Sequence, residues 1–127
     1  MRPDPFDVLI VDDDPEIARL LRMVLESRRY PCRVAYGGAQ ALSRFAARPA
    51  RLVITDLHME AGDGAALIHN IRRWSNVPII IVSGFSRQYA ESVRRMPDVR
   101  MIAKPIEINA LMRQVRACRF SQAGPAN

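Results

Sequence analysis

Three carboxylate residues stand directly after an apolar stretch near the start of the chain. The run "VLIV", residues 8–11, is followed without a spacer by Asp12, Asp13 and Asp14. Two carboxylates about 5 Å apart repel one another by roughly 3 kcal/mol at an effective dielectric constant near 20, so crowding them calls for a compensating charge. A divalent cation such as Mg²⁺, which takes hard oxygen ligands, supplies that charge. The alternative is a polar loop in which one acid caps a helix, and Asp14 suits that role.

Polar side chains follow other apolar stretches in the same way. "LVIT" is followed by Asp56, "IIIV" by Ser83 and Gly84, and "MIA" by Lys104. Lys104 is the only lysine in a chain with 18 arginines, and an ammonium is a compact, reorientable charge that the planar guanidinium does not replace. The alternatives are a serine that caps the next helix and an ordinary surface lysine. Together with Asp12 and Asp13, the side chains of Asp56, Ser83 and Lys104 indicate one polar site.

The apolar stretches themselves are short and rich in β-branched side chains, which predicts strands. Between them the apolar residues recur with helical period, as in the stripe from Ile17 to Leu25, and Pro15 suits the first turn of that helix. The expected strands are residues 8–11, 33–35, 52–55, 79–82 and 99–103. The expected helices are residues 15–25, 39–47, 64–74, 87–95 and 107–119.

Strands that alternate with helices predict an α/β fold with a parallel sheet covered on both faces. The runs "VLIV", "LVIT" and "PIIIV" are continuously apolar, as expected for strands that are buried on both sides. In a doubly wound sheet, binding sites form at the carboxyl ends of the strands, where the strand order reverses. The carboxylates, the serine hydroxyl and the lysine ammonium should therefore lie on one edge of the sheet.

Composition limits the classes of protein to consider. A chain of 127 residues with 49% hydrophobic and 25% charged residues has room for one globular domain. The start "MRPDPFD" lacks the apolar region of a signal peptide, no apolar run is long enough to cross a membrane, and we expect buried thiols at Cys32 and Cys118 in a reducing cytoplasm. The net charge is +6. Its arginines are scattered without interleaved aromatic residues, so we predict no direct binding to nucleic acid or membrane.

Four pieces of the chain, in this order and at these intervals, resemble the receiver domain of two-component response regulators. They are "VLIVDDDP", "RLVITDLHMEAGDG", "IIIVSG" and "AKPI", and the resemblance covers residues 7–120. It implies a flavodoxin-like, doubly wound, five-stranded parallel sheet of strand order 2-1-3-4-5 with five helices, similar to a chemotaxis regulator. The receiver domain would occupy residues 1–120, and residues 121–127 would form a short flexible tail.

The resemblance also implies a role for each carboxylate. Asp56 would be the phosphoacceptor, since a carboxylate can attack a phosphoryl group as a nucleophile. Mg²⁺ or Mn²⁺ would be bound directly by Asp13 and Asp56, with Asp12 acting mainly through water. The backbone carbonyl of His58 would be the remaining protein ligand.

The residues expected to bind the phosphoryl group follow from the same resemblance. Lys104 would pair with its oxygens, and Ser83 would donate its hydroxyl to them. Gly84 would keep the approach to the site open. A cis peptide bond is implied between Lys104 and Pro105, and an X-Pro bond tolerates that geometry.

The chain departs from the family pattern at several positions. Glu60 replaces the usual proline, which adds an acid near the metal. Met101 occupies the place of an aromatic residue that couples the site to the output surface, and methionine packs adaptably but has no ring. Phe85 and His58 stand where side chains govern water access and the lifetime of the phosphoryl group. Phe85 and Met101 are thus the residues expected to couple the site to the rest of the domain.

The function implied is a cytoplasmic phosphorylation switch. A histidine kinase or a histidine phosphotransfer protein would phosphorylate Asp56, and the signal would pass to a protein partner or an output domain; homodimerisation is left open. The chain would catalyse only its own phosphorylation and dephosphorylation. One alternative is a receiver-like binding module that does not use phosphate, a class favoured by Glu60 and Met101. The other is a small Mg²⁺-dependent phosphohydrolase, which is disfavoured because His58 stands where its general acid should be.

Overall fold

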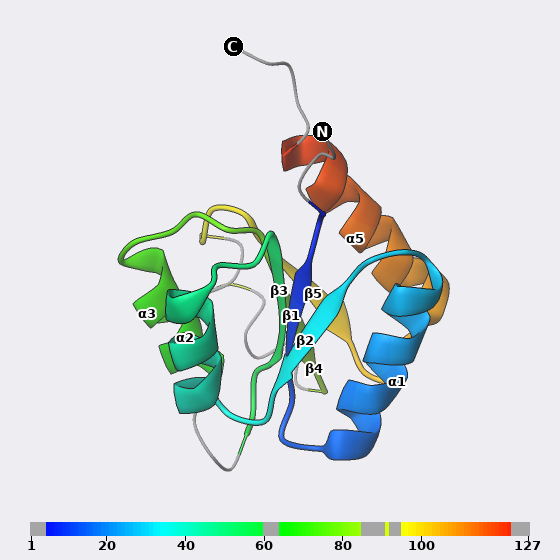
Figure 1. The fold of residues 1–127 in the computed structure, drawn as a ribbon, viewed down its shortest axis with the longest axis horizontal. Coiled ribbons are helices and arrows are strands. Elements are labelled where there is room, and N and C mark those ends of the chain that lie inside the picture. The colour runs from blue at the N-terminus through cyan, green and yellow to red at the C-terminus, as the bar shows by residue number, and fades with distance from the viewer. Residues whose placement is uncertain (1–4, 60–63, 85–90, 92–94, 123–127) are drawn as a thin grey trace.

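The computed structural model describes residues 5–59, 64–84, 91 and 95–122, and Figure 1 shows their arrangement. Five parallel strands form one sheet in the order β2-β1-β3-β4-β5, as the resemblance implied. In chain order the elements are β1 (Val8–Val11), α1 (Pro15–Ser27), β2 (Cys32–Ala35), α2 (Gly38–Ala47), β3 (Leu52–Asp56), α3 (Gly64–Arg72), β4 (Ile79–Ser83), β5 (Val99–Ala103) and α5 (Ile108–Gln122).

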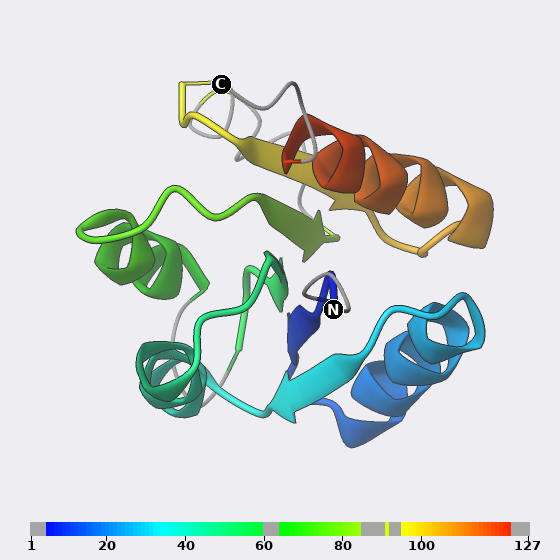
Figure 2. The same cartoon turned by 45° about the horizontal axis from the view of Figure 1, so that its top comes forward.

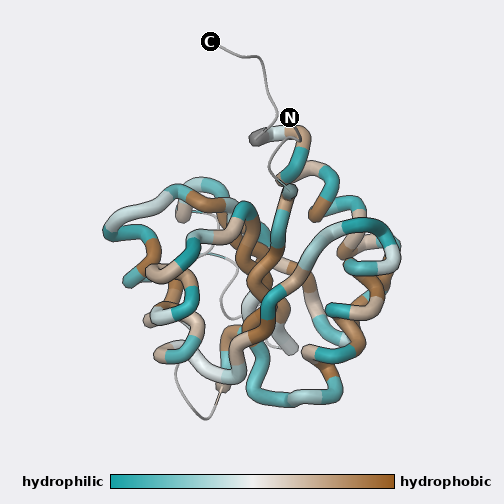
Figure 3. Tube along the Cα trace, in the orientation of Figure 1, coloured by the Kyte–Doolittle hydropathy of each residue, from teal (hydrophilic) through white to brown (hydrophobic). Residues whose placement is uncertain are grey.

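The sheet separates two hydrophobic cores. Helices α1 and α5 cover one face and α2 and α3 cover the other, as both views of the ribbon show (Figures 1 and 2). Successive residues of β1 point to opposite faces, so that Val8 and Ile10 pack under α1 and α5, whereas Leu9 and Val11 pack under α2 and α3. The central strands are therefore buried along their whole length, and they are apolar up to the polar residues at their carboxyl ends (Figure 3). Burial on both faces explains the continuous apolar runs of the sequence.

Helix α1 begins at the residues that the sequence indicated. The side chain of Asp14 accepts a hydrogen bond from the Glu16 backbone N–H at 2.9 Å and so caps the helix, while Pro15 occupies its first turn. The helix then buries Ala18, Leu21 and Leu25 against the sheet. Asp14 is thus the capping acid, and its carboxylate serves the helix.

The helices differ from the expected ones mainly at their ends: α1 continues to Ser27, α2 begins at Gly38 and α3 ends at Arg72. Helix α5 continues to Gln122, three residues beyond the expected end, so residues 121 and 122 are helical although the short tail was expected to begin there. The expected helix at residues 87–95 falls mainly outside the described residues. Within the described part of the chain, four helices cover the sheet.

The structure confirms the expected burial of the two thiols and also places two side chains of α3 and its end. His69 is exposed on the surface of α3, and Trp74 packs beyond the end of α3 against Phe45 of α2, with ring centroids 5.5 Å apart. Cys32 and Cys118 are free and buried, and burial raises the pKa of the Cys32 thiol to about 12. Among the described helices, none has the length and apolar character needed to cross a membrane.

Candidate functional site

The register of the sheet brings the polar strand ends to one edge. Val11 lies beside Thr55, so that the next residues of the two strands, Asp12 and Asp56, follow at the same level. Asp56 in turn lies beside Val82 of β4, which places Ser83 one residue further along that strand. Ser83 is level with Ala103 of β5, directly before Lys104. Residues separated by more than ninety positions in sequence therefore meet at one edge.

The three carboxylates expected to form the site converge. Asp12, Asp13 and Asp56 each offer one oxygen, and these oxygens lie within 4.8 Å of one another. Asp12 is 3% exposed and Asp56 is 8% exposed, so two of the three carboxylates are largely removed from water. Oxygen atoms of acidic residues are the ligands that Mg²⁺ and Mn²⁺ prefer. The donor set fits such a cation.

The raised pKa of Asp12 also favours a cation at this cluster. Burial raises the pKa of this carboxyl, and the neighbouring negative charge of Asp56 adds to the increase. A hydrogen bond from the Asp14 backbone N–H to Asp12 Oδ1, 2.9 Å long, and the charge of Lys104 oppose it without cancelling it. A bound divalent cation would remove this penalty, because it favours the ionised carboxylate.

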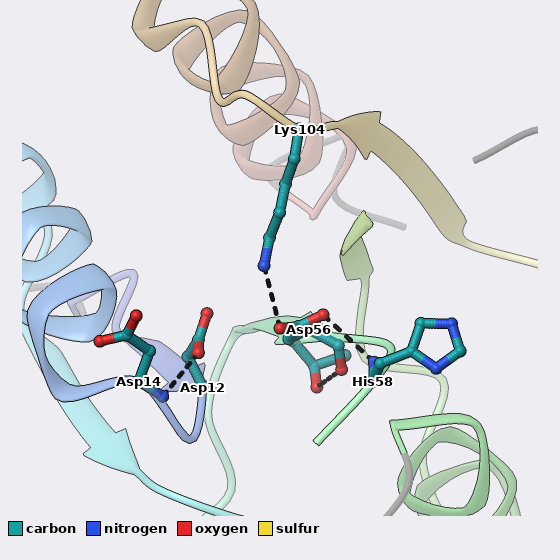
Figure 4. Close-up of polar contacts among 6 residues, drawn as sticks. Asp12, Asp14, Asp56, His58 and Lys104 are labelled. Atoms are coloured by element: carbon teal, nitrogen blue, oxygen red, sulfur yellow. Dashed lines mark hydrogen bonds and ion pairs between the residues drawn. The ribbon is translucent and has the colours of Figure 1, made fainter. Parts of the chain in front are cut away.

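Lys104 lies against the expected phosphoacceptor. Its ammonium Nζ is 3.0 Å from Asp56 Oδ2, and Figure 4 shows the side chain extended toward Asp56 from the end of β5. The Lys104 backbone N–H also donates to the Ser83 carbonyl at 3.0 Å, which keeps these two residues together. The peptide bond between Lys104 and Pro105 is cis, as the resemblance implied.

Three further residues lie around the largely buried Asp56 carboxylate. The His58 backbone N–H donates to Asp56 Oδ1 at 3.2 Å, and the His58 side chain is exposed. Ser83 is fully buried at the end of β4. Gly84 is exposed, and a Cβ atom at this position would meet no atom within 4 Å. This is consistent with the expectation that Gly84 leaves room beside the site, which stays a prediction.

Of the remaining predicted residues, the structure describes only Met101. Met101 is half-buried in β5, where it lies level with Ile81 and packs against the core beneath α2 and α3. It is therefore part of the sheet that carries Lys104, at a distance of three residues along the strand. Glu60 and Phe85 lie outside the described residues.

Two further residues contribute to the site although the sequence did not single them out. The buried Thr55 hydroxyl donates to the Asp56 carbonyl at 2.9 Å. The Gly64 backbone N–H, at the start of α3, donates to the Leu57 carbonyl at 3.0 Å. The sequence signal was faint, because a threonine in a strand and a glycine before a helix are both common.

Comparison with known proteins agrees with this arrangement. Residues 8–116 match the family described as the response regulator receiver domain. The response regulator GtcR of Aneurinibacillus migulanus is 40% identical over 80 residues, which are 63% of this chain and 33% of GtcR. The nitrogen assimilation regulatory protein NtrX of Azorhizobium caulinodans is 37% identical over 110 residues, 84% of this chain and 24% of NtrX. The Francisella response regulator 1452 receiver domain superposes with a TM-score of 0.84 at 26% identity, covering 94% of this chain and 99% of that one.

The fold, the carboxylate cluster and these similarities define the class of protein. The chain belongs to the receiver domain family of response regulators. This family acts in phosphorylation-dependent two-component signalling and binds Mg²⁺ in an acidic pocket, which corresponds here to the cluster of Asp12, Asp13 and Asp56. The chain spans about a third or less of the length of these curated relatives, which are longer regulators.

Proposed function

We propose that this domain is a phosphorylation switch whose phosphoacceptor is Asp56. A carboxylate oxygen of Asp56 attacks the phosphorus atom of a phosphohistidine carried by a histidine kinase or phosphotransfer protein. A bond between oxygen and phosphorus forms, and the bond between phosphorus and the histidine nitrogen breaks, with its electron pair kept by that nitrogen. The observation that carries the proposal is the 3.0 Å contact between Lys104 and the same carboxylate, beside two further acids.

The neighbouring side chains have distinct tasks in this proposal. Asp12, Asp13, Asp56 and the His58 carbonyl hold Mg²⁺ or Mn²⁺, which when bound neutralises charge on the carboxylates and on the incoming phosphoryl oxygens. Lys104 places a positive charge beside the transferred oxygens. Ser83 donates its hydroxyl to them once the aspartyl phosphate has formed. His58 and Glu60 control the access of water to it.

The output of the switch is a changed protein surface. The phosphoryl group adds charge and acceptor oxygens at Asp56, and the movement of Ser83 and Lys104 toward it biases an equilibrium between two conformations. Met101 and Phe85 transmit this change from the site. A downstream protein or an output domain reads it, with the receiver domain spanning residues 1–120 and a homodimer as one further form of readout.

The test is covalent phosphorylation by a small donor. The protein is incubated with phosphoramidate and Mg²⁺, and its intact mass is measured. We expect one phosphoryl adduct in the wild type, no adduct in Asp56→Asn, and no adduct when EDTA removes the metal. Absence of the adduct from the wild type contradicts the proposal and favours a phosphate-independent binding module. Steady phosphate release from a phosphomonoester would instead favour a phosphohydrolase.

A further inference from the structure

Gly64 packs against the backbone of the residues that carry the phosphoacceptor. A Cβ atom at this position would overlap the Asp56 carbonyl oxygen and would lie 2.9 Å from Leu57 Cα and 3.1 Å from the Leu57 carbonyl oxygen. Contacts this short are repulsive, and all three partners are backbone atoms, so no side-chain rotation relieves them. Glycine is the one residue that allows α3 to begin this close to the end of β3.

Helix α3 is not free to move away from this contact. Leu67, Ile68 and Ile71 are buried beneath the helix, in the core that it shares with α2. Lifting the helix would expose these side chains to water. A side chain at position 64 would therefore push on the Asp56–Leu57 peptide instead.

That peptide sets the direction of the phosphoacceptor. Its carbonyl accepts the Thr55 hydroxyl, and the next residue, His58, donates its backbone N–H to Asp56 Oδ1. The Gly64 N–H closes the arrangement by donating to the Leu57 carbonyl at 3.0 Å. Mg²⁺ tolerates little deviation from octahedral ligand positions, so a displacement of a few tenths of an ångström at this peptide weakens its binding.

We propose that Gly64 is a positioning residue, which holds the Asp56 carboxylate and the His58 carbonyl in the geometry needed for the metal and the phosphoryl group. The proposal rests on the proposed function, because Gly64 acts through Asp56. It predicts that Gly64→Ala impairs the site, which is the opposite of what helix propensity predicts. Alanine favours a helix over glycine, so propensity alone predicts that Gly64→Ala is harmless or stabilising.

The experiment compares Gly64→Ala with Ile71→Val, a variant of the same helix. Ile71→Val removes a buried methylene group at the far end of α3, which lowers stability without touching Asp56. Both are studied at a temperature where circular dichroism shows each to be fully folded. We expect Gly64→Ala to bind Mg²⁺ at least fivefold more weakly in calorimetric titration. Its adduct with phosphoramidate should form at least tenfold more slowly, whereas Ile71→Val stays within twofold of the wild type in both measurements.

The outcomes separate this proposal from the proposed function. Wild-type affinity and rate in folded Gly64→Ala overturn the positioning role and leave Asp56 as phosphoacceptor. A wild type that binds Mg²⁺ but forms no adduct overturns the proposed function. The comparison of Mg²⁺ affinities between the wild type and Gly64→Ala then still tests the positioning role of Gly64. If Gly64→Ala does not fold, the positioning role is tested by amide hydrogen exchange in the wild type. Mg²⁺ must then slow exchange at Gly64 more than at Ile71, because coupling between two sites is reciprocal, and equal slowing overturns the proposal.

Discussion

At the scale of single residues, Lys104 and the metal ion of the proposed function would compete for the same carboxylate. The ammonium lies 3.0 Å from Asp56 Oδ2, so it stabilises the metal-free site and repels a cation that enters beside it. The Lys104 side chain is 29% exposed, and solvent weakens both effects. In the proposed function, the ammonium would thus assist phosphoryl transfer to Asp56 and weaken the binding of the cation.

Replacing this lysine should separate the two effects. We expect Lys104→Met to bind Mg²⁺ about three- to tenfold more tightly, a gain of about 0.7–1.4 kcal/mol, because a positive charge next to the site is lost. The same variant should form the phosphoryl adduct more slowly. Calorimetric titration with Mg²⁺ measures the first effect, with Arg113→Met as the control because that cation is exposed. Weaker Mg²⁺ binding in Lys104→Met would contradict the competition.

The raised pKa of Asp12 makes the stability of the metal-free domain depend on pH. Folding favours the protonated form of this carboxyl, so its contribution to stability is fully present below the ordinary pKa of 3.8 and is lost as pH rises through the higher folded-state value. At neutral pH the charged group therefore opposes folding, mainly because it is buried.

Asp12→Asn should consequently stabilise the metal-free protein at pH 7. The amide keeps an oxygen that can accept from the Asp14 N–H but carries no charge. We expect the free energy of unfolding to rise by about 1–3 kcal/mol at pH 7, with a gain that shrinks toward pH 4. Urea titrations in EDTA at both pH values measure it, and Glu107→Gln is the control because that carboxylate is exposed. No difference at pH 7 would show that Asp12 carries no such penalty.

At the scale of elements, the start of α1 divides three adjacent acids between two tasks. Asp12 and Asp13 contribute to the carboxylate cluster, whereas Asp14 caps the helix. We expect Asp14→Ala to lower the free energy of unfolding by about 1 kcal/mol, because one backbone N–H of the first turn loses its acceptor. Its Mg²⁺ affinity should stay within a factor of two of the wild type. Urea titration measures the free energy of unfolding, and calorimetric titration measures the Mg²⁺ affinity. A large loss of Mg²⁺ affinity would place Asp14 in the metal site.

The sequence predicted the strands closely, and for β1, β3 and β4 the reason is that they are buried on both faces. The expected ranges of the first and last strands, residues 8–11 and 99–103, equal the observed ones. The strands at 52–56 and 79–83 each run one residue further, into Asp56 and Ser83, because polar residues at the sheet edge still pair with their neighbours. Apolar periodicity locates the buried part of an element and is blind to such a polar continuation.

The site was less accessible to sequence analysis than the sheet. The convergence of Asp12, Asp13 and Asp56 was predicted, because parallel strands end at one edge. The close approach of Gly64 to Leu57 was not, since it depends on how α3 packs across the sheet and leaves no pattern in the chain. The end of α5 at Gln122 was missed for a related reason, because polar residues can continue a helix beyond its buried stripe.

At the scale of the whole molecule, metal binding and folding are linked. The unfolded chain does not hold Asp12, Asp13 and Asp56 together, so the proposed site would bind Mg²⁺ only in the folded state. We expect saturating Mg²⁺ to raise the free energy of unfolding by about 2.7 kcal/mol when its concentration is a hundred times the dissociation constant. Thermal unfolding with Mg²⁺ and with EDTA measures this, and the increase should largely disappear in Asp13→Asn. An equal increase in that variant would place the cation elsewhere.

A consequence follows from the single lysine of this arginine-rich chain. Lys104 is the only lysine of the chain, so apart from the α-amine its ammonium is the only amine that an amine-selective acylating reagent can modify. That ammonium lies within 3.0 Å of Asp56. In the proposed function, the rate at which this amine is acylated should therefore change when the carboxylate beside it binds a metal ion or becomes phosphorylated.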